Sequence, residues 1–290
     1  MPYINSGNNT PIDNRHSPCQ IIGVSSGKGG VGKTNLIVNL GMVFSKWNYQ
    51  VIILDGDLGM SNVEVLFKVK PPFSLYDVIN GDKSITDIMV ETEKRIKLIS
   101  GGSGIFHLAN MDKQQQERLF HTLPQLERMA DILLIDTGAG LSREVIRFLT
   151  STDTIVLVTT TEPTAMTDVY GMIKVLDRIK TKKAHLVVNM VEKKGEGEDT
   201  FERINLVTKK NLNHIKLSYL GEIPKDQLVP NSIKNCCPLV SYSPNSQTAA
   251  SIEKIAKRIV YDEDMSKIEV NLKGMRGFIE RLKKNITSNP

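Results

Sequence analysis

A glycine-rich segment near the N-terminus carries the residues best suited to chemistry. Residues 24–35 read VSSGKGGVGKTN and contain the pattern G-x-x-x-x-G-K-T. In such a loop the glycines let backbone N–H groups curl around phosphates, the lysine reaches the terminal phosphates and the threonine hydroxyl binds Mg²⁺. A glycine-rich turn without a ligand is the alternative. We expect a nucleotide to be held by Gly27, Lys28, Gly29, Gly30, Val31, Gly32, Lys33, Thr34 and Asn35.

Acidic residues follow two other apolar runs of the chain. Asp55 and Asp57 lie at the carboxyl end of the apolar run 51–54, and Asp136 follows residues 132–135. Because the carboxyl ends of parallel strands meet at one edge of a sheet, these acids should lie near the glycine-rich loop. Carboxylates there can position Mg²⁺ and orient an attacking water. Asp55 as a strand-end cap and Asp136 as a turn carboxylate are the alternatives.

Short runs that are apolar at every position alternate with segments of helical spacing. Continuous apolar runs are typical of strands covered on both faces, as in parallel sheets. The pattern predicts a doubly wound α/β domain with a mostly parallel sheet of about seven or eight strands and helices on both faces. The expected strands contain residues 21–24, 51–54, 96–99, 132–135, 155–158, 186–188 and 217–223. The expected helices contain residues 33–45, 75–80, 113–129, 142–149, 165–179, 201–211 and 245–260, with 193–199 as an exposed loop.

Composition divides the chain into three parts: a flexible leader at 1–18, a domain at 19–262 and a tail at 263–290. The chain has 290 residues and a net charge of +5, and residues 265–290 hold six Lys or Arg and two Glu. The body before the tail is therefore almost neutral, which argues against broad nucleic-acid binding. Three cysteines, Cys19, Cys236 and Cys237, are too few for a disulfide framework, and no apolar run suits a membrane span. These features favour a cytoplasmic protein.

The tail has the spacing of an amphipathic helix. Its apolar residues recur every three or four positions, at Ile268, Leu272, Met275, Ile279, Leu282 and Ile286, and the basic residues fall outside this stripe. A basic amphipathic helix can lie on an anionic membrane, enter a partner groove or pack on its own domain. Spacing alone leaves these alternatives open.

The second lysine of the loop, Lys28, leads to a resemblance. The sequence K-G-G-x-G-K-T resembles the deviant Walker A motif of the MinD/ParA class of P-loop ATPases. In that class the extra lysine contacts the phosphates of the partner in an ATP-bound dimer. The resemblance implies a homodimer in which Lys28 acts in trans, as an arginine finger does elsewhere. A solvated loop lysine is the alternative.

The same resemblance implies roles for further residues. Lys28, Lys33 and Asp57 would be catalytic, with Asp57 positioning water, and the metal group would be Thr34, Asp57 and Asp136, the last through water. Gly138 would lie near the γ-phosphate. Asn189 and the segment containing Pro224 and Asp226 would contact adenine. ATP, rather than GTP, and Mg²⁺ are the implied ligands, and no N-K-x-D guanine box is evident.

Several stretches are most similar to the FlhG family (also YlxH or FleN), MinD-like regulators of flagellar number and placement. They are DGDLGMSNVEVLF, LISGGSGIFHLANM, DTGAGLSREVIRF, TTTEPTAMTDVYGMIKVL and LVVNMV. The likeness implies FlhF and the switch proteins FliM, FliN or FliY as partners, although the leader lacks a D-Q-A-x-x-L-R element. Arg276–Leu282 also resembles the core of the MinD membrane helix, which implies reversible attachment through 265–286 to the inner face of the cell membrane. The alternatives are a MinD-type division-site regulator and a nucleotide-sensing scaffold with little turnover.

Overall fold

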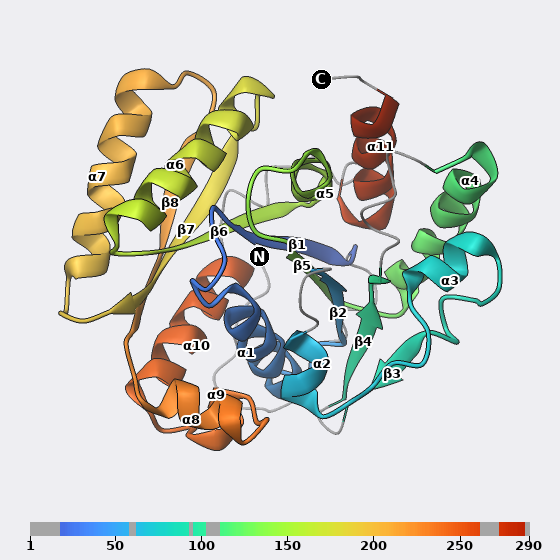
Figure 1. The fold of residues 1–290 in the computed structure, drawn as a ribbon, viewed down its shortest axis with the longest axis horizontal. Coiled ribbons are helices and arrows are strands. Elements are labelled where there is room, and N and C mark those ends of the chain that lie inside the picture. The colour runs from blue at the N-terminus through green and yellow to red at the C-terminus, as the bar shows by residue number, and fades with distance from the viewer. Residues whose placement is uncertain (1–17, 58–61, 93–94, 103–110, 262–272, 288–290) are drawn as a thin grey trace, which may run out of the picture.

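The computed structural model describes residues 18–57, 62–92, 95–102, 111–261 and 273–287. They form three layers, with one eight-stranded sheet between two layers of helices (Figure 1). The strand order is β3-β4-β2-β5-β1-β6-β7-β8, so the first strand of the chain lies in the middle of the sheet. This is the predicted doubly wound α/β fold.

Seven of the strands are mutually parallel, and only the edge strand β3 pairs in the antiparallel sense, with β4. The central strands are buried along their whole length, since both faces are covered. The strands are β1 Gln20–Ser26, β2 Val51–Gly56, β3 Met89–Glu91, β4 Ile96–Ser100, β5 Ile132–Thr137, β6 Thr154–Thr160, β7 Lys183–Val191 and β8 Lys216–Pro224.

The helices divide between the two faces of the sheet. Figure 1 shows α1 and α10 below the sheet and α5, α6, α7 and α11 above it. The longer helices are α1 Lys33–Lys46, α4 Lys113–Thr122, α5 Arg143–Ser151, α6 Pro163–Arg178, α7 Glu196–Asn211, α10 Gln247–Val260 and α11 Gly274–Thr287. The shorter ones are α2 Asn62–Phe67, α3 Leu75–Asn80, α8 Leu228–Lys234 and α9 Leu239–Tyr242.

Two predicted elements need correction. The expected helix 113–129 consists of α4 and a separate 3-10 helix, η3 (Leu123–Arg128). Pro124 lies at the start of η3 and has no N–H with which to continue α4. The expected loop 193–199 is helical from Glu196 onward. There the Glu222 carboxylate of β8 accepts the N–H groups of Gly195 and Gly197, so a distant strand caps this helix start.

The described part of the tail, α11, packs onto the domain. The stripe residues Met275, Ile279 and Leu282 are buried, and Phe278 joins them against Phe148 of α5, with ring centroids 6.1 Å apart. The predicted stripe therefore exists in α11 and is covered by the body. Residues 1–17, Ile268 and Leu272 lie outside the described residues.

Polar contacts hold the start and the middle of α11. At its start, Met275 N–H donates to the Glu127 carboxylate at 2.6 Å. Further along, Arg281 pairs with Asp153 at 2.6 Å and donates to the carbonyl of Ser151. In the described residues no helix is both long and apolar enough to cross a membrane.

Candidate nucleotide site

The glycine-rich loop joins β1 to α1 and bends through two left-handed glycines. Gly30 and Gly32 have φ values of +81° and +88°, a region that glycine enters without steric cost. Gly27 is needed for another reason, because a Cβ there would come within 2.3 Å of the backbone of Asp168 in α6. The loop is thus wedged against α6 and opens at Gly29 and Gly30, where a Cβ would meet nothing.

Lys33 lies at the first position of α1, with its side chain only 6% exposed. Its Nζ forms an ion pair and hydrogen bond with Oδ1 of Asp136 and lies 3.6 Å from Oδ2 of Asp57. A buried ammonium is tolerated because carboxylates compensate its charge. The structure therefore brings together three of the residues that the sequence singles out, from the loop, β5 and the end of β2.

The acids meet because their strands are neighbours in register. Asp55 of β2 and Asp136 of β5 are direct cross-strand partners, and both are buried. Oδ1 of Asp55 also accepts the N–H of Asp57 at 3.1 Å, so the strand-end capping role considered for Asp55 is present. Burial, and secondarily the charge of Asp136, raises the pKa of Asp55 to about 7. Burial likewise raises the pKa of Asp136, against the opposing effect of Lys33.

Several buried polar atoms at this edge of the sheet are ready for a ligand. Within the described residues, Oδ2 of Asp136, Oδ2 of Asp55 and Nδ2 of Asn35 have no hydrogen-bond partner. Buried polar atoms are rarely left in this state without water or a ligand. Thr34 forms a side-chain hydrogen bond with Asp136, and its hydroxyl adds another oxygen to this group of possible ligands. In the described chain no group of three or more His, Cys, Asp or Glu could hold a metal ion alone, so Mg²⁺ would need phosphate and water oxygens as well.

Lys28 points to α6. Its Nζ lies 2.9 Å from the Glu162 carboxylate and 3.1 Å from the Thr164 hydroxyl. Sequence reasoning did not identify Glu162 as its partner. The available signal was the position of Glu162 two residues after β6, at the same edge of the sheet as the loop.

The residues expected around adenine lie at the ends of β7 and β8. Asn189 donates from Nδ2 to the carbonyl of Val31 at 2.8 Å, and this contact leaves no room for a Cβ at Gly32. Asp226 accepts from Leu228 N–H and the Thr248 hydroxyl, so its carboxylate organises the segment after β8. Pro224 closes β8, and Gly138 is buried after β5.

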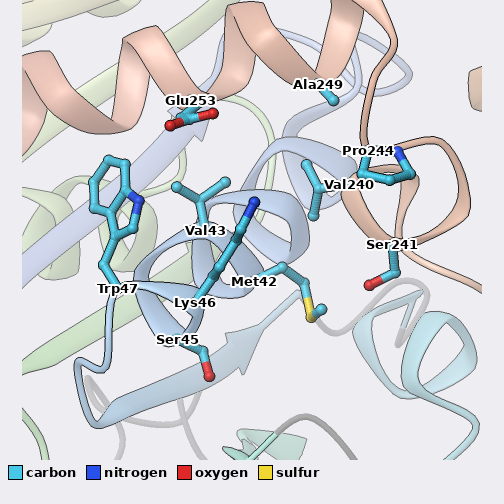
Figure 2. Close-up of a pocket in the computed structure, with 10 residues that line it drawn as sticks. All are labelled: Met42, Val43, Ser45, Lys46, Trp47, Val240, Ser241, Pro244, Ala249 and Glu253. Atoms are coloured by element: carbon cyan, nitrogen blue, oxygen red, sulfur yellow. The ribbon is translucent and has the colours of Figure 1, made fainter. Parts of the chain in front are cut away.

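A separate hollow lies at the opposite end of α1. It has a volume of about 260 Å³ and lies between the end of α1, α9 and α10, with Trp47, Val240 and Glu253 among its walls (Figure 2). None of the residues lining it comes from the glycine-rich loop or the strand-end acids. It is therefore distinct from the candidate nucleotide site.

The raised pKa of Asp55 predicts a pH-dependent stability. The native state binds this proton more tightly than the unfolded chain, so the free energy of unfolding should fall as pH rises from about 4 to 7. Asp55→Asn keeps an oxygen to accept the Asp57 N–H and removes the titration. At pH 8 without nucleotide it should be more stable than the wild type by on the order of 2 kcal/mol, measured by urea denaturation. Asp82→Asn, at an exposed position, is the matched control. If the free energy of unfolding depended on pH in the same way in both variants across pH 4–8, the prediction would be contradicted.

Comparisons with known proteins show which family has these features. The sequence model of the ParA family, described as NUBPL iron-transfer P-loop NTPase, matches residues 18–260. The chain is 33% identical to the flagellum site-determining protein YlxH of Helicobacter pylori, over 91% of this chain and 90% of that one. It is 31% identical to the antiactivator FleN of Pseudomonas aeruginosa, over 91% of this chain and 94% of FleN.

A solved structure confirms the fold. The septum site-determining protein MinD of Pyrococcus horikoshii, in complex with Mg-ADP, superposes with a TM-score of 0.68 at 24% identity, covering 86% of this chain and all of that one. The sequence relatives, the family match and the loop with its strand-end acids agree. The chain belongs to the MinD/ParA family of P-loop ATPases, in the group that contains YlxH and FleN.

Proposed function

We propose that this ATPase binds MgATP at the glycine-rich loop, hydrolyses it as a homodimer and uses the cycle to control flagellar number and placement. The observation that carries the proposal is the convergence of Lys33, Asp57 and Asp136 at the head of the loop. The relative YlxH is named a flagellum site-determining protein, and this name supplies the flagellar context.

Lys33 is the group that would change partner when nucleotide arrives. Its ammonium now neutralises Asp136 and approaches Asp57, and phosphate oxygens would draw it away from both. Asp136 would then be free to hold the water shell of a metal ion, and Thr34 would supply a direct oxygen. Bound Mg²⁺ would neutralise charge on the terminal phosphates.

Asp57 is the better placed of the acids to orient the attacking water. Its side chain is 29% exposed at the mouth of the site, whereas Asp55 and Asp136 are buried. Gly138, after β5, leaves the backbone near the expected γ-phosphate position uncovered by a side chain. Asn189, with Pro224 and Asp226 on the next strand end, would form the side of the site that receives adenine.

Lys28 would act on the nucleotide of the second copy. Its ion pair with Glu162 joins side chains that are 34% and 65% exposed, and exposed pairs of this kind contribute about 0–1 kcal/mol. Such a weak contact can be exchanged for a partner's phosphates at little cost. The loop is open at Gly29 and Gly30, which leaves room for the second copy to approach.

Substitutions in these residues test the catalytic assignment. Asp57→Ala should lower phosphate release at saturating MgATP by about 10²-fold, because water would lose its orienting group. Lys28→Ala should lower it about tenfold or more and remove the dependence of the specific rate on protein concentration.

Glu162→Gln is the matched control for the Lys28→Ala variant. It removes the ion-pair partner and leaves the lysine, so it should retain wild-type turnover or exceed it. If Asp57→Ala kept the wild-type rate of phosphate release, Asp57 would not be the group that orients water. That result would favour a nucleotide-sensing scaffold with little turnover. Wild-type turnover in Lys28→Ala would sink the action in trans.

Membrane attachment would require α11 to leave the body. Its stripe residues are buried against α5 and η3, so they cannot contact lipid in the described arrangement. Release would expose both the stripe and the basic face, and each Lys or Arg near an anionic surface contributes about 1 kcal/mol. Two released helices on one dimer would bind more strongly than one on a monomer through effective concentration.

A substitution on the body side can separate docking from lipid contact. Asp153→Asn removes the charge that holds Arg281 and leaves the tail sequence intact. It should increase nucleotide-free cosedimentation with phosphatidylglycerol vesicles, whereas truncation after Asp264 should abolish binding with any nucleotide. Glu202→Gln, an equal charge change on the exposed face of α7, is the control. Binding that survives the truncation would overturn the role of the tail.

The cellular output would be exerted through FlhF and switch proteins of the FliM, FliN or FliY type. A division-site role is the second candidate, favoured by the fold shared with the septum site-determining protein MinD. Deletion of the gene should change flagellar number while leaving septum position unchanged, as counted by electron microscopy. Normal flagellation accompanied by minicells would replace the first role with the second.

A further inference from the structure

A groove of about 890 Å³ lies away from the nucleotide site, along α5. Its walls come from α5, the end of α6, the starts of β6 and β7, and α11, which Figure 1 shows beside α5. No residue of the glycine-rich loop and none of the strand-end acids lines it. The groove is therefore a second concave surface, larger than a single small anion requires.

The groove combines an apolar floor with basic walls. Ile146 and Ile155 are buried at its base, and Ile179 and Leu141 are 43% and 49% exposed at its edges. Among the residues that line it, Asp153 is the single carboxylate, and it already pairs with Arg281. The exposed cations Arg143, Lys180 and Lys182 stand around the apolar surface.

One cation of the groove, Arg147, is largely buried and has an Nε without a partner among the described residues. The side chain of Arg147 is 9% exposed, and in the described chain its Nε has no hydrogen-bond partner, while no ion pair to it is present. Leaving a buried nitrogen of a charged group without a partner is costly unless an anion or water satisfies it. A carboxylate entering the groove would remove this cost and form a charge-assisted hydrogen bond.

We propose that this groove docks an acidic amphipathic segment of a protein partner. Its carboxylates would meet Arg147 and the cations of the walls, and its apolar side chains would cover Ile146, Ile155 and Ile179. A flat bilayer surface fits this arrangement poorly, because Ile146 and Ile155 are buried in the concavity, where a flat surface would not reach them. The phosphate backbone of a nucleic acid would leave the apolar floor uncovered.

Docking would also bear on the tail. Arg281 and Asn285 of α11 line the groove together with residues of α5 and of the α6–β7 turn. A segment that spans both sides would add contacts that exist only while α11 is packed. The partner would therefore favour the packed helix over the released one.

The test is a selection of displayed random 16-residue peptides on the full-length protein. The wild type should enrich peptides in which Asp or Glu flank apolar residues, and the strongest of them, made synthetically, should bind in fluorescence anisotropy with an affinity that falls in salt. The double variant Arg143→Glu, Lys182→Glu, which changes two exposed residues, should lose this enrichment. The Arg147→Gln variant should bind the synthetic peptide with an affinity at least tenfold lower. The double variant should keep its ATPase rate, which separates this proposal from that of the nucleotide site.

Lys209→Glu, a charge reversal on the exposed face of α7, is the matched control and should enrich the same peptides as the wild type. Equal enrichment on the wild type and the double variant, or enrichment without acidic residues, would overturn the proposal. If the wild type selected no peptide but bound phosphatidylglycerol vesicles, and the double variant lost this vesicle binding, the groove would be assigned to lipid instead. Should Arg147→Gln fail to fold, the exposed double variant still decides the outcome.

Discussion

The ammonium of Lys33 is the charge on which the arrangement of this protein depends. It is buried at the start of α1, where burial is tolerable only because Asp136 and Asp57 lie beside it. Those acids reach it because β5 lies next to β1 and β2 lies next to β5. The sheet order thus serves the site directly. The same lysine is the group that phosphate would attract, so nucleotide binding must disturb the interaction that organises the site.

The acids around Lys33 differ because their depths differ. Asp55 and Asp136 face each other in register and are both buried. Burial raises the pKa of each, that of Asp55 to about 7, while Lys33 opposes the rise at Asp136. Asp57, two residues further along the chain, lies past the end of β2 and is partly exposed. One short segment therefore supplies a buried carboxylate that shapes the loop and an accessible one suited to meet solvent.

Local patterns predicted most of the framework because burial on both faces leaves a plain signature. Residues 51–54 and 132–135 are apolar at every position, and both became central strands with their acids at the carboxyl end. The patterns failed where distant parts of the chain decide. The start of α7 depends on Glu222 of β8, and the short edge strand β3 depends on pairing with β4. In the site, Lys28 and Asn189 were identified by type, but their contacts with Glu162 and Val31 come from segments more than 100 residues away and could not be read from spacing.

The helix α5 connects the surfaces that matter. It begins a few residues after Asp136 and Gly138, and it ends at Ser151, whose carbonyl accepts Arg281 of α11. Phe148 of α5 packs on Phe278, and Arg147 lines the groove, so the nucleotide edge, the tail and the groove all contact one rigid element of about 13 Å in length. A shift of the segment after β5 on phosphate binding would move α5 and change the surface on which α11 lies. If α5 instead stays fixed, nucleotide and tail can be linked only through the second copy. The position of α5 makes these two routes distinguishable, because only the first operates in a monomer.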